Sequence, residues 1–447
     1  MVLWISSFYR FVDIGDVEGH ALWQREQLQS LLGRVTVASE GVNGTLSGSA
    51  EALDIYEARL RLKLNVEDME FHRSASEEQR VFPDLKVVVS RELVGNGEVV
   101  ARALRGASAH RGTHLSPAAF KEKLERGDSL VLDVRNGFEF DVGRFEGAVK
   151  APIRTMSEWG AWVERSGIVD VAKRENKEIL TYCTGGVRCE KATQFLLALG
   201  APKVSQLKGG ICSYLDAYPD SDNFKGRNFL FDAREAKSST KNPVGKCSDC
   251  NKPWDTHSGR NLCSVCETLT LVCDDCRRTN HDHYCDIHTY LRETYCYFLD
   301  VYTDDQLQQQ EINLHNLFRK QTSYGRRKKS RNQRRTEPLA QPLQQDSLPS
   351  DEETRLPTSS ANVRRALRKQ LERLRQRRRE NKETTSPSIY RGPPRCRSCG
   401  LADCQGFCWG FWAACGGAEN TTAPLGEEAS TSNLSQTDVR SSKIESD

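Results

Sequence analysis

One cysteine within residues 178–200 carries the strongest chemical signal in the chain. Cys183 follows a short apolar run that predicts a buried strand, and an amphipathic run that predicts a helix begins shortly after it. Gly185 and Gly186 allow the backbone to curl, so that successive N–H groups and the positive end of the helix dipole point at the thiol. Arg188 adds a fixed positive charge. Such a loop stabilises a thiolate, so we expect Cys183 to be a nucleophile.

The length of this loop favours one sulfur chemistry over another. Four residues separate Cys183 from Arg188, namely Thr184, Gly185, Gly186 and Val187. Cys-dependent phosphatases have one residue more between their cysteine and arginine, because their loop must surround a phosphate. The shorter loop suits a persulfide sulfur. The alternative interpretation is a buried structural cysteine beside a strand-to-helix turn.

Several motifs resemble those of rhodanese-fold proteins. Residues 183–192, CTGGVRCEKA, resemble the active loop of the rhodanese-related tRNA uridine hydroxylases. Residues 133–148, DVRNGFEFDVGRFEGA, resemble the rhodanese stretch in which Asp-x-Arg follows a strand, and residues 209–211 resemble the glycine pair after the last strand. The likeness is close over residues 116–218 and looser from the N-terminus through the first cysteine cluster. Residues 142–145, VGRF, depart from the Gly-His-Ile of many rhodaneses.

The resemblance implies an enzyme that oxidises C5 of the wobble uridine of tRNA, with Cys183 and Arg188 as catalytic residues. Addition of the thiolate to C6 of uridine is one route by which a cysteine would make C5 electron-rich. The short loop favours a second interpretation, a sulfurtransferase that moves sulfur from thiosulfate or a persulfide donor to an acceptor. A third interpretation is a non-enzymatic, zinc-stabilised adaptor, and the presence of both loop residues argues against it.

Three further residues of this region each have a chemical and a structural interpretation, and a fourth has only a structural one. Asp133 and Arg135 close another predicted strand at the same sheet edge, where they either border the pocket or form an ion pair that fixes a turn. Cys189 lies in the first turn of the predicted helix. It either resolves an oxidised Cys183 by forming a disulfide or packs beneath the loop. Cys212 is expected to be a small core residue.

The sixteen cysteines of the chain indicate metal binding rather than disulfides. The first residues lack the pattern of a secretory signal, and Cys-x-x-Cys pairs in a reducing compartment are typical of zinc sites. We expect two closed, structural zinc sites from ten candidate ligands: Cys247, Cys250, Cys263, Cys266, Cys273, Cys276, His281, His283, Cys285 and His288. A weaker second cluster would bind one zinc ion through four of five residues: Cys396, Cys399, Cys404, Cys408 and Cys415. No flavin or nicotinamide signature is present.

Composition and charge point to a chain with both globular and polar parts. Of the 447 residues, 37% are hydrophobic, and the mean hydropathy is −0.62. No apolar run approaches the length of a membrane span, so we expect no membrane contact and a cytoplasmic location, with the nucleus possible. Residues 361–382 predict a basic helix that binds phosphates of tRNA or another RNA. Residues 325–335, GRRKKSRNQRR, are an alternative nuclear address, and a solvated charged tail is the alternative for both basic segments.

These patterns together predict an α/β fold class with several domains. The order of predicted strands and helices at the N-terminus favours a ferredoxin-like α+β domain with an extra edge strand, and the alternating order after it favours a rhodanese-like parallel α/β domain. The predicted organisation is as follows: a ferredoxin-like domain at 1–94, a linker at 95–115, a rhodanese domain at 116–235, a Cys/His-rich zinc module at 245–290, a helical segment at 291–323, a disordered linker at 324–390 containing the basic helix, a second cysteine-rich segment at 396–415 and a disordered tail at 416–447.

Overall fold

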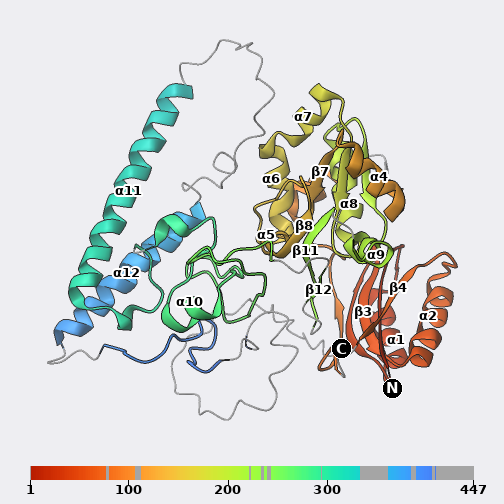
Figure 1. The fold of residues 1–447 in the computed structure, drawn as a ribbon, viewed down its shortest axis with the longest axis horizontal. Helices are drawn as coiled ribbons and strands as arrows, with labels where there is room; N and C mark the ends of the chain where they lie inside the picture. The colour runs from red at the N-terminus through yellow and green to blue at the C-terminus, as the bar shows by residue number, and fades with distance from the viewer. Residues whose placement is uncertain are drawn as a thin grey trace, which may run out of the picture.

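The computed structural model contains two α/β domains followed by a cysteine-rich module and a pair of long helices (Figure 1). It describes residues 2–76, 80–105, 112–220, 223–232, 236–238, 243–292, 294–332, 361–383, 389–404 and 408. The fold class is therefore mixed α/β, as predicted. The predicted disordered tail at 416–447 lies outside the described residues, as does Cys415. Within the described part of the chain, no helix has the length and apolar character needed to cross a bilayer.

The N-terminal domain has the predicted ferredoxin-like order of elements. They are β1 (Leu3–Phe11), α1 (Val17–Gln27), β2 (Leu32–Ala38), β3 (Gly41–Gly48), α2 (Ala50–Leu64), β4 (Phe71–Ser76) and β5 (Leu85–Val89). The sheet order is β4-β1-β3-β2-β5, in which β5 is the extra edge strand and pairs in parallel with β2. The side chains of Asp16 and Ser49 accept hydrogen bonds from the first turns of α1 and α2, which explains where both helices begin.

The two helices of this domain cover one face of its sheet and leave part of the other face open (Figure 1). Successive side chains of a strand point to opposite faces. Phe8 packs with Val35 and Leu53 in the helix-covered core, so Ser7 and Tyr9 lie on the opposite face. Their cross-strand partners share that face, which makes it the polar side of the sheet.

The second domain has a four-stranded parallel sheet in the order β6-β10-β9-β7. Its elements are β6 (Thr113–Leu115), α4 (Pro117–Arg126), β7 (Leu130–Asp133), α5 (Gly137–Val142), α6 (Trp159–Ser166), α7 (Ile168–Glu175), β9 (Ile179–Tyr182), α8 (Val187–Ala198), β10 (Val204–Leu207) and α9 (Gly210–Ala217). One core cluster centres on Trp159 and Phe195, and another centres on Phe145 and Tyr214. Apolar cores on both sides of the sheet are the arrangement expected of a parallel α/β domain.

The segment 95–115, predicted as a linker between the two domains, contains regular secondary structure. This segment forms α3 (Gly97–Leu104) and continues, after residues that are not described, into β6 at the edge of the parallel sheet. Val100 is almost fully buried against the core that contains Trp159. The glycines and charges of the segment suggested a linker, but the apolar residues of α3 supply a buried helix face.

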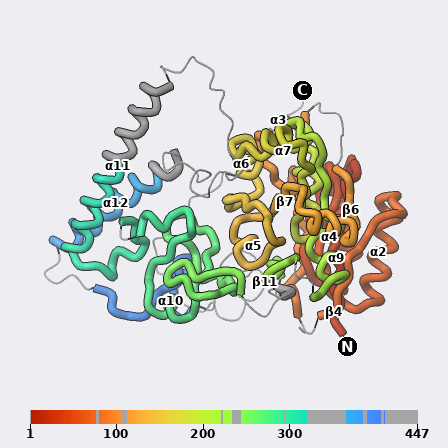
Figure 2. The backbone as a smooth tube through the Cα atoms, turned by 45° about the horizontal axis from the view of Figure 1, so that its top comes forward, coloured from red at the N-terminus to blue at the C-terminus, as the bar shows by residue number. Residues whose placement is uncertain are grey.

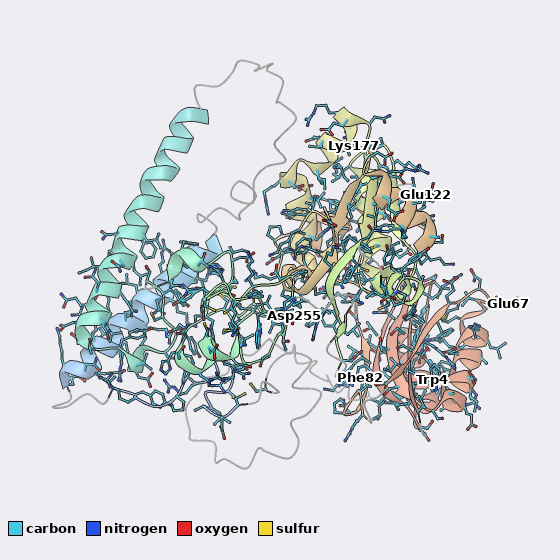
Figure 3. The ribbon with its side chains drawn as sticks, in the orientation of Figure 1. Trp4, Glu67, Phe82, Glu122, Lys177 and Asp255 are labelled. Atoms are coloured by element: carbon cyan, nitrogen blue, oxygen red, sulfur yellow. The ribbon has the colours of Figure 1, made fainter. Side chains whose placement is uncertain are left out.

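The C-terminal part is held together by short strands, cysteine loops and two helices. A small antiparallel sheet joins β8 (Gly143–Phe145), β11 (Phe224–Phe229) and β12 (Ala236–Ser238). The cysteine-rich module contains α10 (Asp274–Thr279) and lies between the second domain and the helices α11 (Asp304–Asn332) and α12 (Ala361–Glu383) (Figures 1 and 2). Asp255, labelled in Figure 3, lies where the module meets the second domain and pairs with Arg227 of β11 at 3.2 Å.

The helices α11 and α12 differ from the prediction at one boundary and agree with it on the basic helix. Residues 324–332, expected to be disordered, belong to α11, and the basic helix predicted at 361–382 is α12. Leu367 and Leu374 of α12 are buried with Leu307 and Leu314 of α11. The basic helix therefore uses its apolar stripe for packing.

Candidate functional site

Cys183 lies at the carboxyl end of β9, where the chain turns into α8. Gly186 has a φ of 100°, a left-handed conformation that a residue with a side chain rarely adopts, and it is the residue from which α8 starts. Its N–H donates a hydrogen bond to Cys183 Sγ at 3.0 Å. The predicted curled loop thus has at least one backbone donor directed at the sulfur.

The start of α9 packs against the cysteine loop through backbone hydrogen bonds, and this packing requires another glycine. Ile211 N–H donates to the Cys183 carbonyl at 2.9 Å, and Cys212 N–H donates to the Thr184 carbonyl at 3.1 Å. A Cβ atom on Gly210 would lie 2.5 Å from the Cys183 carbonyl oxygen. Only glycine permits this close approach of two backbone segments.

Arg188 is fixed by an acidic residue that the sequence reasoning missed. Its guanidinium nitrogens lie 2.6 and 2.8 Å from the carboxylate oxygens of Glu139, whose side chain is fully buried, and it also donates to the Thr184 hydroxyl at 3.1 Å. Glu139 also accepts a hydrogen bond from Asn136 N–H at 3.1 Å. The pattern Asn-x-x-Glu is a capping box, so a capping signal was present, but nothing local links it to Arg188.

The charges around the loop favour ionisation of Cys183. Burial opposes the charged form, but a hydrogen bond from the Cys189 thiol, the Arg188 charge and the N–H groups of Arg188 and Gly186 outweigh it and lower the pKa of Cys183 to about 6. Burial and the neighbouring Cys183 raise the pKa of Cys189 well above its usual range. Cys183 is therefore the thiolate of the pair and Cys189 its protonated neighbour. The role of Cys189 as a resolving thiol stays a prediction.

Asp133 and Arg135 form the ion pair that was one of their two interpretations. The Arg135 guanidinium lies 2.7 Å from Asp133 Oδ2, and both side chains are almost completely buried. Arg135 also donates to the Gly143 carbonyl at 2.6 Å, which ties the end of β7 to the start of β8. Neither residue lines the cleft above Cys183, so the geometry supports a structural role rather than a place at the pocket edge.

A cleft of about 1200 Å³ lies between the two N-terminal domains, with the cysteine loop on one wall. Cys183, Thr184, Gly185, Val187 and Arg188 line that wall. The opposite wall is the open face of the N-terminal sheet, whose lining residues include Ser7, Tyr9, Phe11, Asn43, Thr45, His72 and Ser74. The site predicted on one domain is therefore shared by two.

Two residues directly after the loop hold the domains together. Oε1 of Glu190 accepts hydrogen bonds from Tyr9 at 3.0 Å and Gln206 at 2.7 Å, and it lies 2.8 Å from Nε2 of His114. Burial and the negative charge of Glu190 raise the pKa of Tyr9, so its hydroxyl remains a donor. Lys191 contacts Glu40 of the N-terminal domain at 2.7 Å.

Within the described residues, eleven cysteines and one histidine gather into three groups with the composition of tetrahedral metal sites. In each group the sulfur and nitrogen atoms lie within 4.8 Å of one another. The groups are Cys247, Cys250, Cys273 and Cys276; Cys263, Cys266, Cys285 and His288; and Cys396, Cys399, Cys404 and Cys408. Each group offers four soft or borderline donors and no further position, which fits a closed structural metal site.

Two of the ten candidate ligands of the first cluster fall outside these groups. His283 Nδ1 lies 2.8 Å from a carboxylate oxygen of Asp249. The His281 ring packs beside Phe298 and Tyr390 instead of facing a cysteine group. The first and third Cys-x-x-Cys motifs together form one group, and the second motif forms the other group with Cys285 and His288. The spacing of the motifs alone leaves this pairing open.

The lowered pKa of Cys183 predicts how fast its thiol is alkylated. Because only the thiolate reacts, the rate should rise about tenfold per pH unit up to a midpoint near pH 6 and level off above about pH 7. The rate is measured for iodoacetamide by mass spectrometry of the peptide that contains Cys183. Cys189, whose pKa is raised, should not react over the same range.

The double variant Glu139→Gln, Arg188→Met tests the effect of the Arg188 charge on the pKa of Cys183 without leaving a buried carboxylate unpaired. It removes both charges together, so no unpaired carboxylate remains, and it should move the midpoint up by at least about one pH unit. A wild-type midpoint near pH 8.5, the ordinary cysteine value, would contradict the electrostatic account of the loop.

Three family models match successive parts of the chain. An "UPF0176 acylphosphatase like domain" matches residues 3–93, a "Rhodanese-like domain" matches residues 116–217, and a "Rhodanase C-terminal" model matches residues 225–288. The first two correspond to the domains that enclose the cleft, and the third spans the first cysteine cluster.

Curated relatives extend over the same region. "Rhodanese-like domain-containing protein 6" of Arabidopsis thaliana is 31% identical over 63% of this chain, which spans about half (52%) of that protein. The "tRNA uridine(34) hydroxylase" of Staphylococcus carnosus is 36% identical over 52% of this chain and 71% of its own length. That of Wolbachia pipientis is 30% identical over 61% of this chain and 96% of its own length. The chain therefore belongs to the tRNA uridine(34) hydroxylase family of rhodanese-like enzymes.

Proposed function

We propose that this protein oxidises C5 of a wobble uridine in tRNA and that Cys183 is the reactive thiol. The observation that carries the proposal is the cleft in which a cysteine with a lowered pKa faces a polar sheet from a second domain. The relatives named tRNA uridine(34) hydroxylase support both the reaction and the substrate. The surroundings of the cysteine indicate its chemical role.

The proposed route begins when the Cys183 thiolate forms a bond to C6 of uridine. The electron pair of the C5–C6 double bond then makes C5 a nucleophile, which attacks an oxygen atom of a two-electron oxidant of the hydroperoxide class while the O–O bond breaks and an alcohol or water leaves. Loss of the C5 proton and cleavage of the C6–S bond restore the double bond and the thiolate. Uridine is oxidised, the peroxide is reduced, and Cys183 is unchanged at the end.

Arg188 and the loop N–H groups act on this route by stabilising the thiolate before attack and after release. Glu139 keeps the Arg188 guanidinium in place through two hydrogen bonds. Cys183 itself has no exposed surface, so a uridine ring reaches the sulfur only when side chains that line the cleft move aside. Substrate binding and opening of the cleft are therefore coupled in this proposal.

Sulfur transfer is a second candidate function, and the short loop favours it. The loop between Cys183 and Arg188 has the length expected for a persulfide, and the residue after Cys183 contributes a hydroxyl that already contacts Arg188. In this reaction thiosulfate would transfer its outer sulfur to the thiolate and release sulfite, and a nucleophilic acceptor would then remove that sulfur. A thiosulfate-to-cyanide assay detects such activity directly.

We further propose that α12 contributes sequence-independent contacts to RNA. Arg365, Arg368, Lys369 and Arg379 are exposed on α12, whereas Arg378 is engaged by Glu311 of α11 at 2.9 Å. The exposed cations are available for phosphates, and such contacts weaken as salt is added.

The tRNA assignment predicts a specific change in modified nucleosides. In cells that lack this protein, 5-hydroxyuridine and its derivatives should fall, and wild-type protein should restore them. Cys183→Ser should leave them at the level of the deletion, because a hydroxyl is far less ionised than the thiol. Nucleoside mass spectrometry of total tRNA provides the measurement.

Cys212→Ser is the matched control, because Cys212 lines the same cleft but lies outside the loop. It should restore the nucleosides as wild type does. Full rescue by Cys183→Ser would exclude thiol chemistry, and an unchanged nucleoside profile in the deletion would transfer the assignment to sulfur transfer.

The three cysteine groups are proposed to be structural zinc sites, which predicts three zinc ions per chain. Elemental analysis of the full chain checks the number. Cys399→Ser should reduce the content to two, since Cys399 belongs to the third group, and Cys212→Ser should leave it at three. Retention of three ions by Cys399→Ser would show that the third group is not a metal site.

A further inference from the structure

We propose that Tyr9, Phe11 and Phe231 form a base-stacking site that holds the single-stranded RNA segment around the target uridine. The inference rests on the proposed function and adds to it the part of the protein that binds the substrate. It gives the N-terminal domain, in which the sequence shows no catalytic constellation, a share in binding the substrate.

The three rings come from both walls of one cleft. Tyr9 and Phe11 are two positions apart on β1, so they share the open face of the sheet, and their ring centroids lie 6.3 Å apart at an angle of 74°. Phe231 follows β11, and its centroid lies 5.9 Å from Cζ of Arg188. All three residues line the cleft together with Cys183.

Phe231 is a large apolar side chain that lines the cleft and remains partly exposed. Its exposed fraction is 45%. The ring forms a T-shaped pair with Phe229 at a centroid distance of 5.2 Å, which helps to fix its position. An exposed, fixed aromatic ring beside an arginine is a suitable platform for a nucleobase, because every base has a π-face that stacks on it.

The polar side chains between the rings can bind the edges of unpaired bases. Asn43 and Thr45 of β3 lie on the same face as the aromatic pair, opposite Tyr9 and Ser7 of β1. Together they offer amide and hydroxyl groups that both donate and accept hydrogen bonds. Single-stranded RNA leaves the Watson–Crick edges of its bases unpaired, whereas a duplex uses those edges for base pairing.

The cations of the cleft favour stacking over phosphate binding as its main source of affinity. Arg10 is paired with Asp68 at 2.8 Å, Arg34 with Asp84 at 2.6 Å and Lys208 with Glu70 at 2.5 Å. These carboxylates neutralise much of the positive charge, so a phosphate backbone gains little here. A peptide acceptor would not need three aromatic platforms beside a cysteine loop, and RNA is therefore the ligand that the surface fits best.

The experiment measures binding of a fluorescein-labelled RNA hairpin with a uridine in its loop to the full-length protein by anisotropy. The salt concentration is chosen to suppress sequence-independent phosphate contacts. Phe11→Ala and Phe231→Ala should each weaken binding about tenfold, because each removes one stacking platform. Phe11→Tyr and Phe231→Tyr keep a ring and should bind as wild type does.

Leu62→Ala is the matched surface control, since Leu62 is 81% exposed on α2, on the covered side of the sheet. It should not change the affinity. The Cys183 alkylation midpoint, measured in parallel, should stay near pH 6 in every ring variant and so shows that the loop is intact.

Three results would overturn the inference: hairpin affinity unchanged in both alanine variants, equal competition by a duplex of the same sequence, or equal weakening by Leu62→Ala. None of these bears on the nucleoside assay with Cys183→Ser, so the hydroxylation proposal survives them. Conversely, the alanine variants can weaken binding while the nucleoside profile of cells that lack the protein stays unchanged. That result would support the proposed RNA-binding site and contradict the proposed hydroxylation.

Discussion

One carboxylate oxygen, Oε1 of Glu190, meets three side chains from separate parts of the chain. Tyr9 comes from the N-terminal sheet, His114 from the edge strand of the parallel sheet and Gln206 from its neighbour. Because Glu190 is in the first turn of the helix that follows Cys183, these contacts fix the N-terminal domain directly over the reactive loop. Lys191 extends the contact to Glu40. This docking forms the cleft beside Cys183.

Charge is distributed around the loop so that each buried ion has a partner. Arg188 is shared between Glu139 and the Cys183 thiolate, and Asp133 is satisfied by Arg135. Buried charges without such partners would be strongly destabilising. The pairs also keep the end of β7, the capped start of α5 and the cysteine loop in a fixed relation, which is what preorganises a thiolate before the substrate arrives.

Local patterns predicted those features that depend on neighbouring residues. The strand before Cys183, the glycine turn and the helix after it follow from apolar spacing and glycine content, and the leucine spacing of α12 predicted its extent. The contacts that complete the site join residues far apart in sequence. Tyr9 reaches Glu190 and Glu139 reaches Arg188 only after folding, and no periodicity encodes either contact.

The lack of a local signal for long-range contacts also explains where the structure differs from the predictions. Residues 95–115 looked like a linker because their glycines and charges outweighed a short apolar face that only becomes evident beside Trp159. His281 and His283 are predicted as ligands because they lie among cysteines. In the folded chain, the first and third Cys-x-x-Cys motifs come together and the second joins Cys285 and His288, so neither of the two other histidines is part of a group. Composition identified the cysteine-rich module, and topology decided which residues form each group.

The most direct test of the shared site is photo-crosslinking with a tRNA that carries 4-thiouridine in place of the target uridine, followed by peptide mapping. Crosslinks are expected in peptides that contain β1 and Phe231, because a base bound beside Cys183 would contact both walls of the cleft. Crosslinks confined to α12, with none in either wall, would contradict the shared site, because the RNA would then be bound away from the cysteine loop.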